Sequence, residues 1–393
     1  MGNFKPDIDL LQNRLSAVAL PEDLKLRLQR MLDRLKAVDN AGGQTLEELE
    51  NISKYIGWAT LIPFGVYSED NLDLQHARQM LDSGHYGLQA VKENILEFIA
   101  SQNLLKARRL LNSNTGGPGA NSGANSGAIA PTSAMPVPQI VPTHLNTNVR
   151  SGTPILCFVG VQGIGKTTMA KSIANTMGRG FQRIALGAFA NVNELRGASR
   201  TDAGAEPGQI TKALMRSRSM NPVILLDEID KVSDSTGLRV DIMAALLEVL
   251  DPEQNKEFVD RYLDYPLDLS QVLFITTANN LGSISAALLD RLEIIRFSSY
   301  TDEEKQHIAR DYLLPKVRAI SGIQPQQLEF ADTVWTLLIR PLGFDPGIRQ
   351  LERNLLQLCR KVAKLIVEGQ ATKIVLTPQN FRQFFPEEIA VFS

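Results

Sequence analysis

The sequence predicts an α/β fold in which a parallel sheet is flanked by helical regions towards both ends of the chain. Three apolar runs carry this prediction, namely 155–159, 222–226 and 272–275. Unbroken apolar runs of this length are typical of strands that are buried on both faces of a parallel sheet. Segments with helical periodicity alternate with these runs, as they do in α/β proteins.

The composition excludes several broad classes of protein. The chain has 393 residues, of which 44% are hydrophobic and 21% charged, and its net charge is −2. Such a charge gives no global attraction to nucleic acid or to a membrane surface. No apolar run approaches the roughly 18 residues that a membrane span needs, and the N-terminus has no basic-then-apolar signal. Two cysteines offer no disulfide framework, so we expect a cytoplasmic protein.

Shifts in composition divide the chain into four regions. We expect an N-terminal helical region at 1–111, a flexible low-complexity linker at 112–150, the α/β domain at 151–300 and a helical domain at 301–393. The linker is rich in Gly, Asn, Ser and Pro and has few large apolar side chains to bury. The helices near the N-terminus form either a small bundle that packs on a larger domain or an exposed hairpin that docks a partner.

The first apolar run leads into a glycine-rich phosphate-binding motif. Residues 160–167 read GVQGIGKT, which fits G-x-x-x-x-G-K-[ST], and a helix is predicted from Thr168 to Met177. Glycines let backbone N–H groups close around a phosphate. Lys166 would reach the β- and γ-phosphates, and Thr167 would ligate Mg²⁺. The residues expected to bind the nucleotide here are Gly160, Gly163, Ile164, Gly165, Lys166, Thr167 and Thr168.

The second and third runs end in polar side chains that suit hydrolysis. Asp227 and Glu228 close the second run, where Asp227 would hold Mg²⁺ and Glu228 would activate a water molecule. Asn279 closes the third run and would hydrogen-bond that water or the γ-phosphate. The alternatives are a solvated acidic turn and an ordinary turn asparagine.

A cation near the start of a C-terminal helix indicates a further contact with an anion. Asp345 and Pro346 form a strong helix start, and Arg349 follows in the first turn. A cation at this position opposes the helix dipole, so we expect Arg349 to face an external anion.

Together these motifs resemble the ATPase module of Lon proteases, within the AAA+ superfamily. The resemblance covers roughly residues 44–111 and 151–385. It rests on LLDEIDK at 225–231, ALLEVLDPEQN at 245–255, LLDRLEIIRFSSYTDEEK at 288–305, PGIRQLER at 346–353 and HYGL at 85–88.

This resemblance implies an AAA+ P-loop ATPase that uses ATP and Mg²⁺, with an N-terminal helical segment and a small C-terminal helical lid. In its terms Lys166 and Thr167 are the Walker A pair, Asp227 and Glu228 the Walker B pair, Asn279 sensor 1, Arg291 the arginine finger, Arg349 sensor 2, and His85, Tyr86 and Gly87 the turn that helps to enclose the adenine. A finger that reaches a neighbouring subunit implies a ring, so we expect a homo-oligomer, namely a hexamer.

The chain departs from the family pattern in ways that bear on function. Because the sequence ends at Ser393, we expect it to lack the Ser–Lys peptidase domain of the family, and we expect it to lack the N-terminal β-rich domain as well. The 112–150 linker is longer than its counterpart. In the segment that matches the first pore loop, Asp202-Ala203 replaces an aromatic–aliphatic pair that grips the substrate polypeptide. Leu238 is an alternative source of that grip.

These features favour an ATP-hydrolysing ring that remodels or assembles a protein partner without intrinsic proteolysis. One alternative is the ATPase part, or a separate subunit, of an ATP-dependent Lon-type protease. Another is a nucleotide-switched scaffold that translocates nothing, which Asp202-Ala203 supports. Work on nucleic acid is a weaker option, because the net charge does not favour it.

Overall fold

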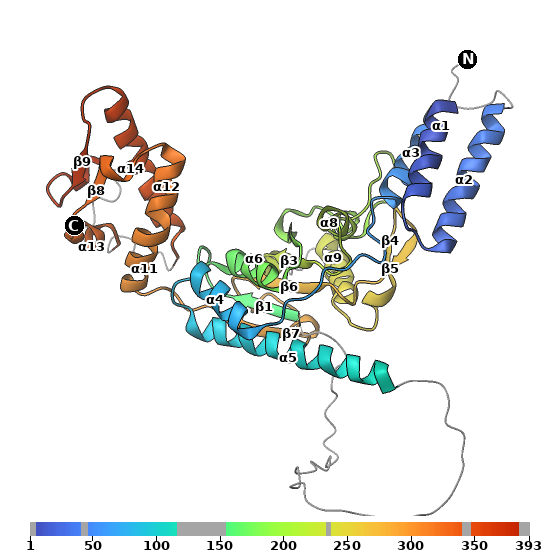
Figure 1. Cartoon of the computed structure of the whole chain (residues 1–393), viewed down its shortest axis with the longest axis horizontal. Helices are drawn as coiled ribbons and strands as arrows, with labels where there is room; N and C mark the ends of the chain where they lie inside the picture. The colour runs from blue at the N-terminus through green and yellow to red at the C-terminus, as the bar shows by residue number, and fades with distance from the viewer. Residues whose placement is uncertain (1–4, 41–45, 116–154, 233–236, 340–346, 385–393) are drawn as a thin grey trace, which may run out of the picture.

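A five-stranded parallel sheet lies at the centre of the molecule, with helical regions at the two ends of its long axis (Figure 1). The computed structural model describes residues 5–40, 46–115, 155–232, 237–339 and 347–384. The strand order is β2-β3-β6-β1-β7, and every pairing within this sheet is parallel. The predicted α/β fold with a parallel sheet is confirmed.

The order of the strands explains which of them the sequence revealed. The strands are β1 (Ile155–Val159), β2 (Phe181–Ala185), β3 (Val223–Asp227), β6 (Leu273–Ala278) and β7 (Leu292–Arg296). Every residue of the three inner strands β1, β3 and β6 is buried, whereas the edge strands β2 and β7 bury one residue each. The inner strands therefore gave the long apolar runs, and the edge strands gave none.

Alternate strand residues enter two separate hydrophobic cores. Leu156 and Phe158 pack with α6 (Lys166–Met177), while Cys157 faces the core that contains α8 (Gln209–Ser217) and α9 (Gly237–Val249). Shorter elements complete this domain: η1 (Leu186–Ala188), α7 (Asn193–Arg196), η2 (Ile229–Lys231), η3 (Asn255–Glu257), the hairpin β4 (Phe258–Asp260) and β5 (Tyr265–Leu267), and α10 (Ala286–Leu289).

The N-terminal helices form a bundle that packs on the sheet domain. They are α1 (Lys5–Ala17), α2 (Glu22–Asn40) and α3 (Leu46–Ala59), and their buried leucines belong to the same core as α8 and α9. The Tyr55 hydroxyl donates a hydrogen bond of 2.8 Å to the carbonyl of Leu263, between β4 and β5. This agrees with the first of the two interpretations, a bundle that packs on a larger domain.

Two further helices connect the bundle to the sheet on its other side. They are α4 (Leu74–Gly84), which packs on α6, and α5 (Gln89–Thr115), which runs along the sheet (Figure 1). Residues 112–115 belong to α5, so the predicted linker boundary at 112 was wrong. Asn and Ser lower helix propensity only slightly, and the helix therefore continues to Thr115. The rest of the predicted linker lies outside the described residues.

The C-terminal region consists of helices with one small sheet. Its elements are α11 (Asp302–Ile308), the π-helical turn η4 (Ala309–Leu313), α12 (Leu314–Ser321), η5 (Pro325–Gln327), β8 (Leu328–Phe330), α13 (Asp332–Ile339), α14 (Arg349–Val367), β9 (Ile374–Leu376) and α15 (Phe381–Phe384). Asp345 and Pro346 lie outside the described residues. Helix α14 begins at Arg349, later than predicted, because Gly347 and Ile348 pack against the glycine-rich loop.

None of the helices in the described ranges is long and apolar enough to cross a bilayer.

Candidate functional site

The glycine-rich loop has the backbone geometry of a phosphate cradle. Gly163 and Gly165 have φ angles of 81° and 98°, in the left-handed region that side chains disfavour. Helix α6 begins directly at Lys166, two residues earlier than predicted, with Gly165 as its N-cap. The first N–H groups of a helix have no partner within the helix, and here they follow the loop directly. The local structure therefore fits an anion with several oxygens.

The Lys166 ammonium meets Asn279 at the carboxyl ends of neighbouring strands. Its Nζ donates to the Asn279 Oδ1 at 2.9 Å, to the Val161 carbonyl at 3.0 Å and to the Gly160 carbonyl. This contact follows from the sheet order, because β1 and β6 are adjacent. Burial lowers the pKa of Lys166, and the nearby Asp227 carboxylate opposes that shift.

Asp227 is a buried carboxylate that accepts a hydrogen bond from a different side chain at each of its two oxygens. The Thr277 hydroxyl donates to its Oδ1, and the Arg183 Nε donates to its Oδ2 at 2.7 Å. The Thr277 oxygen also accepts from the Glu228 backbone N–H at 2.9 Å. Thr277 on β6 therefore joins both acidic residues to the strand that carries Asn279.

Glu228 stands at a bend just beyond β3. Its φ and ψ are 60° and 50°, a left-handed conformation that is uncommon for a residue other than glycine. Its Oε2 forms an ion pair of 2.7 Å with Lys231 Nζ, and this contact raises the pKa of the lysine. The bend turns the glutamate away from the strand axis and gives its carboxylate a fixed cationic neighbour.

The site suits a divalent cation that is shared with a nucleotide. Among the described residues there is no cluster of three or more His, Cys, Asp or Glu that would hold a metal ion by itself. The hydroxyl of Thr167 and the carboxylate of Asp227 are hard oxygen donors, which Mg²⁺ prefers. Because Mg²⁺ commonly completes its shell with water and phosphate oxygens, these two protein donors fit it.

The C-terminal region lies directly against the glycine-rich loop. The Ile348 N–H donates to the Gly163 carbonyl at 3.1 Å. A Cβ placed on Gly163 would lie 3.1 Å from the Cγ of Arg349, so the loop and the first turn of α14 are in contact. Arg349 therefore lies beside the cradle.

The 85–87 turn packs between α6 and α11. His85 is buried, its Nε2 lies 2.9 Å from the Ser172 hydroxyl on α6, and burial lowers its pKa to about 4. The Tyr86 ring stacks on His307 with the centroids 4.7 Å apart. Gly87 has a φ of 67°, and a Cβ there would collide with Glu304. The contact of this turn with adenine stays a prediction.

Arg291 is held away from these groups within its own chain. Its Nη2 donates to the Asp251 Oδ2 at 2.7 Å. The Asp251 Oδ1 accepts backbone N–H groups from Glu253 at 2.9 Å and Gln254 at 3.3 Å. The carboxylate is thus fixed by the turn after α9, and it fixes the guanidinium in turn.

The 198–206 loop, which contains Asp202 and Ala203, lies against the N-terminal bundle. The Arg200 guanidinium sits 4.4 Å above the centroid of the Tyr55 ring, and a cleft of about 490 Å³ separates the loop from α2 and α3. Asp202 and Ala203 are exposed. The side chain of Leu238 lies outside the described part of the chain.

Comparison with known proteins agrees with this geometry. Residues 156–300 match the model of the ATPase family associated with various cellular activities (AAA), and residues 320–375 match that of the Lon protease AAA+ ATPase lid domain. The chain carries a Lon-type AAA+ ATPase module.

Curated Lon proteases are similar to nearly the whole chain. Lon protease from Bacillus thuringiensis is 38% identical over 374 residues, which are 95% of this chain and 41% of that protein. Lon protease 2 from Thermus thermophilus is 39% identical over 96% of this chain and 42% of its own. For Lon protease 1 from Bacillus subtilis the identity is 36%, over 98% and 43%. The chain thus spans about two fifths of these relatives.

Sequence reasoning missed three side chains of the Lon-type module that touch the candidate site. Arg183 and Lys231 pair with Asp227 and Glu228, and the Tyr300 hydroxyl donates to the carbonyl of Ile164. Arg183 is 44 residues from Asp227, and Tyr300 is 136 residues from Ile164, so no local pattern signalled either contact. Lys231 follows Glu228 by three residues, a spacing that could have suggested an ion pair.

Proposed function

We propose that this Lon-type module binds and hydrolyses ATP at the carboxyl ends of β1, β3 and β6. The contact between Lys166 and Asn279 supports this proposal most directly, since it joins the phosphate loop to the polar end of a neighbouring strand. Asp227 and Glu228 lie close enough for their charges to oppose the lowered pKa of Lys166. The phosphate loop, the Lys166 ammonium and the two carboxylates therefore all lie at the carboxyl ends of these inner strands.

In the proposed mechanism each side chain has one task. The backbone N–H groups of 163–168 and the Lys166 ammonium would hold the phosphates, and Thr167 and Asp227 would hold Mg²⁺, which would supply positive charge for the phosphate oxygens. Glu228 accepts a proton from the attacking water, and Asn279 orients that water. Arg349 contributes positive charge from the lid side, and the 85–87 turn packs against the base.

We propose further that the module works as a homo-oligomeric ring, namely a hexamer. Arg291 would then act on the nucleotide of a neighbouring subunit, because within its own chain it is bound to Asp251 rather than to the cradle. Asp251 would aim the guanidinium across the interface. This assembly would operate in the cytoplasm, where both buried cysteines stay free thiols.

The proposed target of this ring is a protein partner that it remodels or assembles, with no peptide-bond cleavage by these 393 residues themselves. The ATPase part or subunit of an ATP-dependent Lon-type protease is the first alternative, and casein degradation that requires both this chain and a separate peptidase would support it. A nucleotide-switched scaffold is the second, favoured by the exposed Asp202 and Ala203 in place of an apolar pair.

Replacing Glu228 by glutamine tests the proposed hydrolytic site. Glu228→Gln keeps the size of the side chain but removes the base, so Mg²⁺-dependent phosphate release should fall roughly 10²- to 10⁴-fold. The affinity for ADP, measured by fluorescence with a labelled analogue, should stay within about twofold because the cradle is unchanged.

Glu257→Gln is the matched control, since Glu257 belongs to η3 next to the β4–β5 hairpin. It should leave both turnover and binding unchanged. Equal phosphate release by the wild type and Glu228→Gln would contradict the proposed role of Glu228.

A further inference from the structure

We propose that Tyr300 is a positioning residue which, together with the lid backbone at Ile348, holds two peptide planes of the phosphate loop in the orientation that receives a nucleotide. This inference rests on the proposed nucleotide site. The segment between β7 and α11 would then take part in nucleotide binding, a role that the sequence of the phosphate loop alone does not reveal.

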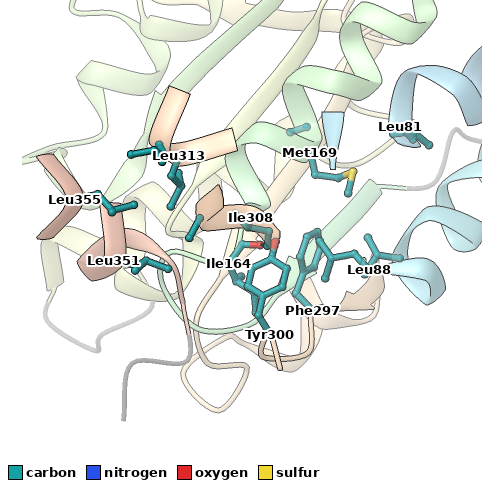
Figure 2. Close-up of a cluster of buried hydrophobic side chains, with 14 of the residues drawn as sticks. Leu81, Leu88, Ile164, Met169, Phe297, Tyr300, Ile308, Leu313, Leu351 and Leu355 are labelled. Atoms are coloured by element: carbon teal, nitrogen blue, oxygen red, sulfur yellow. Dashed lines mark hydrogen bonds between the residues drawn. The ribbon is translucent and has the colours of Figure 1, made fainter. Parts of the chain in front are cut away.

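The Tyr300 side chain reaches the loop from the start of the lid region. It is buried, and its hydroxyl donates to the Ile164 carbonyl at 2.9 Å (Figure 2). Thr301, the next residue, caps α11 and forms a capping box with Glu304. The backbone that carries the tyrosine is therefore fixed at the point where the lid begins.

The second contact comes from the middle of the lid, just before α14 begins at Arg349. Ile348 donates its N–H to the Gly163 carbonyl at 3.1 Å. Gly347 lies so close to the loop that a Cβ on it would be 2.5 Å from the Gln162 carbonyl oxygen. Leu351 and Leu355 of α14, together with Ile308, Tyr300 and Ile164, belong to one apolar cluster (Figure 2).

Because of peptide geometry, these two hydrogen bonds fix the direction in which two N–H groups of the phosphate loop point. In a trans peptide the C=O and the following N–H point in opposite directions. When the Ile164 carbonyl faces Tyr300, the Gly165 N–H faces the opposite side of the loop. By the same reasoning, the bond from Ile348 directs the Ile164 N–H away from the lid backbone. Two successive donors are thereby set for an anion.

The glycines of the loop make such fixing necessary. Gly163 and Gly165 both have positive φ, and glycine can rotate between left- and right-handed conformations at little cost. Without outside donors, the planes between these glycines would sample orientations that point carbonyl oxygens at the phosphate. Burial raises the pKa of Tyr300 to about 12, so its hydroxyl remains a donor at neutral pH.

Tyr300→Phe tests the proposal by removing one hydroxyl and keeping the ring. We expect the dissociation constant for a fluorescent ADP analogue with Mg²⁺ to rise about five- to tenfold, the value expected for one lost hydrogen bond. The KM for ATP should rise similarly while kcat stays within about twofold, because the reacting groups are untouched.

Tyr55→Phe is the matched control. It removes another buried tyrosine hydroxyl that donates to a backbone carbonyl, at 2.8 Å from Leu263, in the N-terminal bundle. Both variants should lose a similar amount of thermal stability without nucleotide. Tyr300→Phe alone should lose affinity, whereas a purely structural role for Tyr300 would give two variants with unchanged affinity and would overturn the proposal.

A second variant keeps the proposal falsifiable if Tyr300→Phe does not fold. Gly347→Ala pushes the start of α14 away from Gln162 and should also weaken ADP binding at least about fivefold. Gly57→Ala, where an added Cβ would make only an ordinary contact of 3.9 Å with Arg14 Nη1, should leave binding unchanged. Unchanged binding by Gly347→Ala would overturn the inference. Failure of the wild type itself to bind ADP or ATP would instead refute the proposed function.

Discussion

Two loops of the sheet domain are each held by a helical region from an opposite end of the molecule, but by different kinds of contact. The phosphate loop receives a buried hydroxyl from Tyr300 and a backbone N–H from Ile348. The 198–206 loop is held through Arg200, which lies over Tyr55 and 3.5 Å from the exposed carboxylate of Asp264. One loop is fixed by neutral hydrogen bonds, of which the one from Tyr300 is buried, and the other loop is held by charged groups near the surface.

The different contacts that hold the two loops indicate which of them can change conformation more easily. Buried hydrogen bonds are directional and costly to break, whereas surface ion pairs contribute little to stability. The phosphate loop should therefore keep one shape, and the tip of the 198–206 loop should rearrange readily. The base of the second loop is rigid, however, because the buried Asp260 accepts hydrogen bonds from Gly208 N–H at 2.8 Å and from the Thr211 hydroxyl at 2.6 Å.

The largest expected effect is a loss of folding stability at the rigid base of the 198–206 loop. Asp260→Ala leaves four donors without an acceptor, those of Gly208, Thr211, Tyr262 and Leu263. The free energy of unfolding, from urea titration followed by circular dichroism, should fall by about 3–5 kcal/mol.

Asp264→Ala, in the same hairpin, is the control for that experiment. Its side chain is 62% exposed, so the loss should stay below about 1 kcal/mol. Similar losses for both variants would remove the contrast between a rigid base and a loosely held tip.

A smaller effect is expected near the phosphate loop, and it depends on pH. The pKa of His85 falls from 6.5 to about 4 on folding, chiefly through burial and further through Lys92. The neutral ring is therefore favoured in the folded state, and its contribution is complete above pH 6.5 and lost as the pH falls through 4. Over that window wild-type stability should drop by at most about 3 kcal/mol relative to His85→Gln.

Urea titrations of both proteins at pH 7, 5.5 and 4.5 measure this difference, and the subtraction cancels the groups that they share. Asp260 should act with the opposite sign, because burial raises its pKa and favours the protonated form at low pH. A constant difference between wild type and His85→Gln across the window would mean that His85 does not titrate as its burial implies.

The smallest effect on stability, and the sharpest on function, is expected at the exposed loop tip. Asp202→Tyr with Ala203→Ile should change the free energy of unfolding by less than about 0.5 kcal/mol, since both positions are exposed. If the ring pulls polypeptides, the added apolar contact should increase ATP-dependent unfolding of a tagged fluorescent substrate. Rapid unfolding by the wild type would instead rule out the scaffold alternative.

The sequence predicted the inner part of the site because its signals are local. The run at 155–159, the glycine motif and Asp227-Glu228 each lie within a few residues, and their meeting at one sheet edge follows from parallel strand packing. Asn279 was a weaker prediction that depended on β6 lying beside β1, and the structure has that order.

The contacts that the sequence did not predict join distant segments or depend on exposure. Strand β2 has one buried residue, so its apolar signal was too short to recognise, and Arg183 was missed with it. The bond from Tyr300 to Ile164 depends on how the lid folds back, which no periodicity encodes. The start of α14 was misplaced because packing of Gly347 on the loop overrides the favourable helix start at Asp345-Pro346.

The central sheet separates two cores that belong to opposite ends of the molecule. Leu225 faces the core shared with the lid, and its neighbour Leu226 faces the core shared with the N-terminal bundle. Both cores therefore pack on the same five strands. If either the lid or the bundle lost its packing, one face of the sheet would become exposed. The sheet should therefore make the lid and the bundle melt in a single calorimetric transition, although they do not adjoin each other in space (Figure 1).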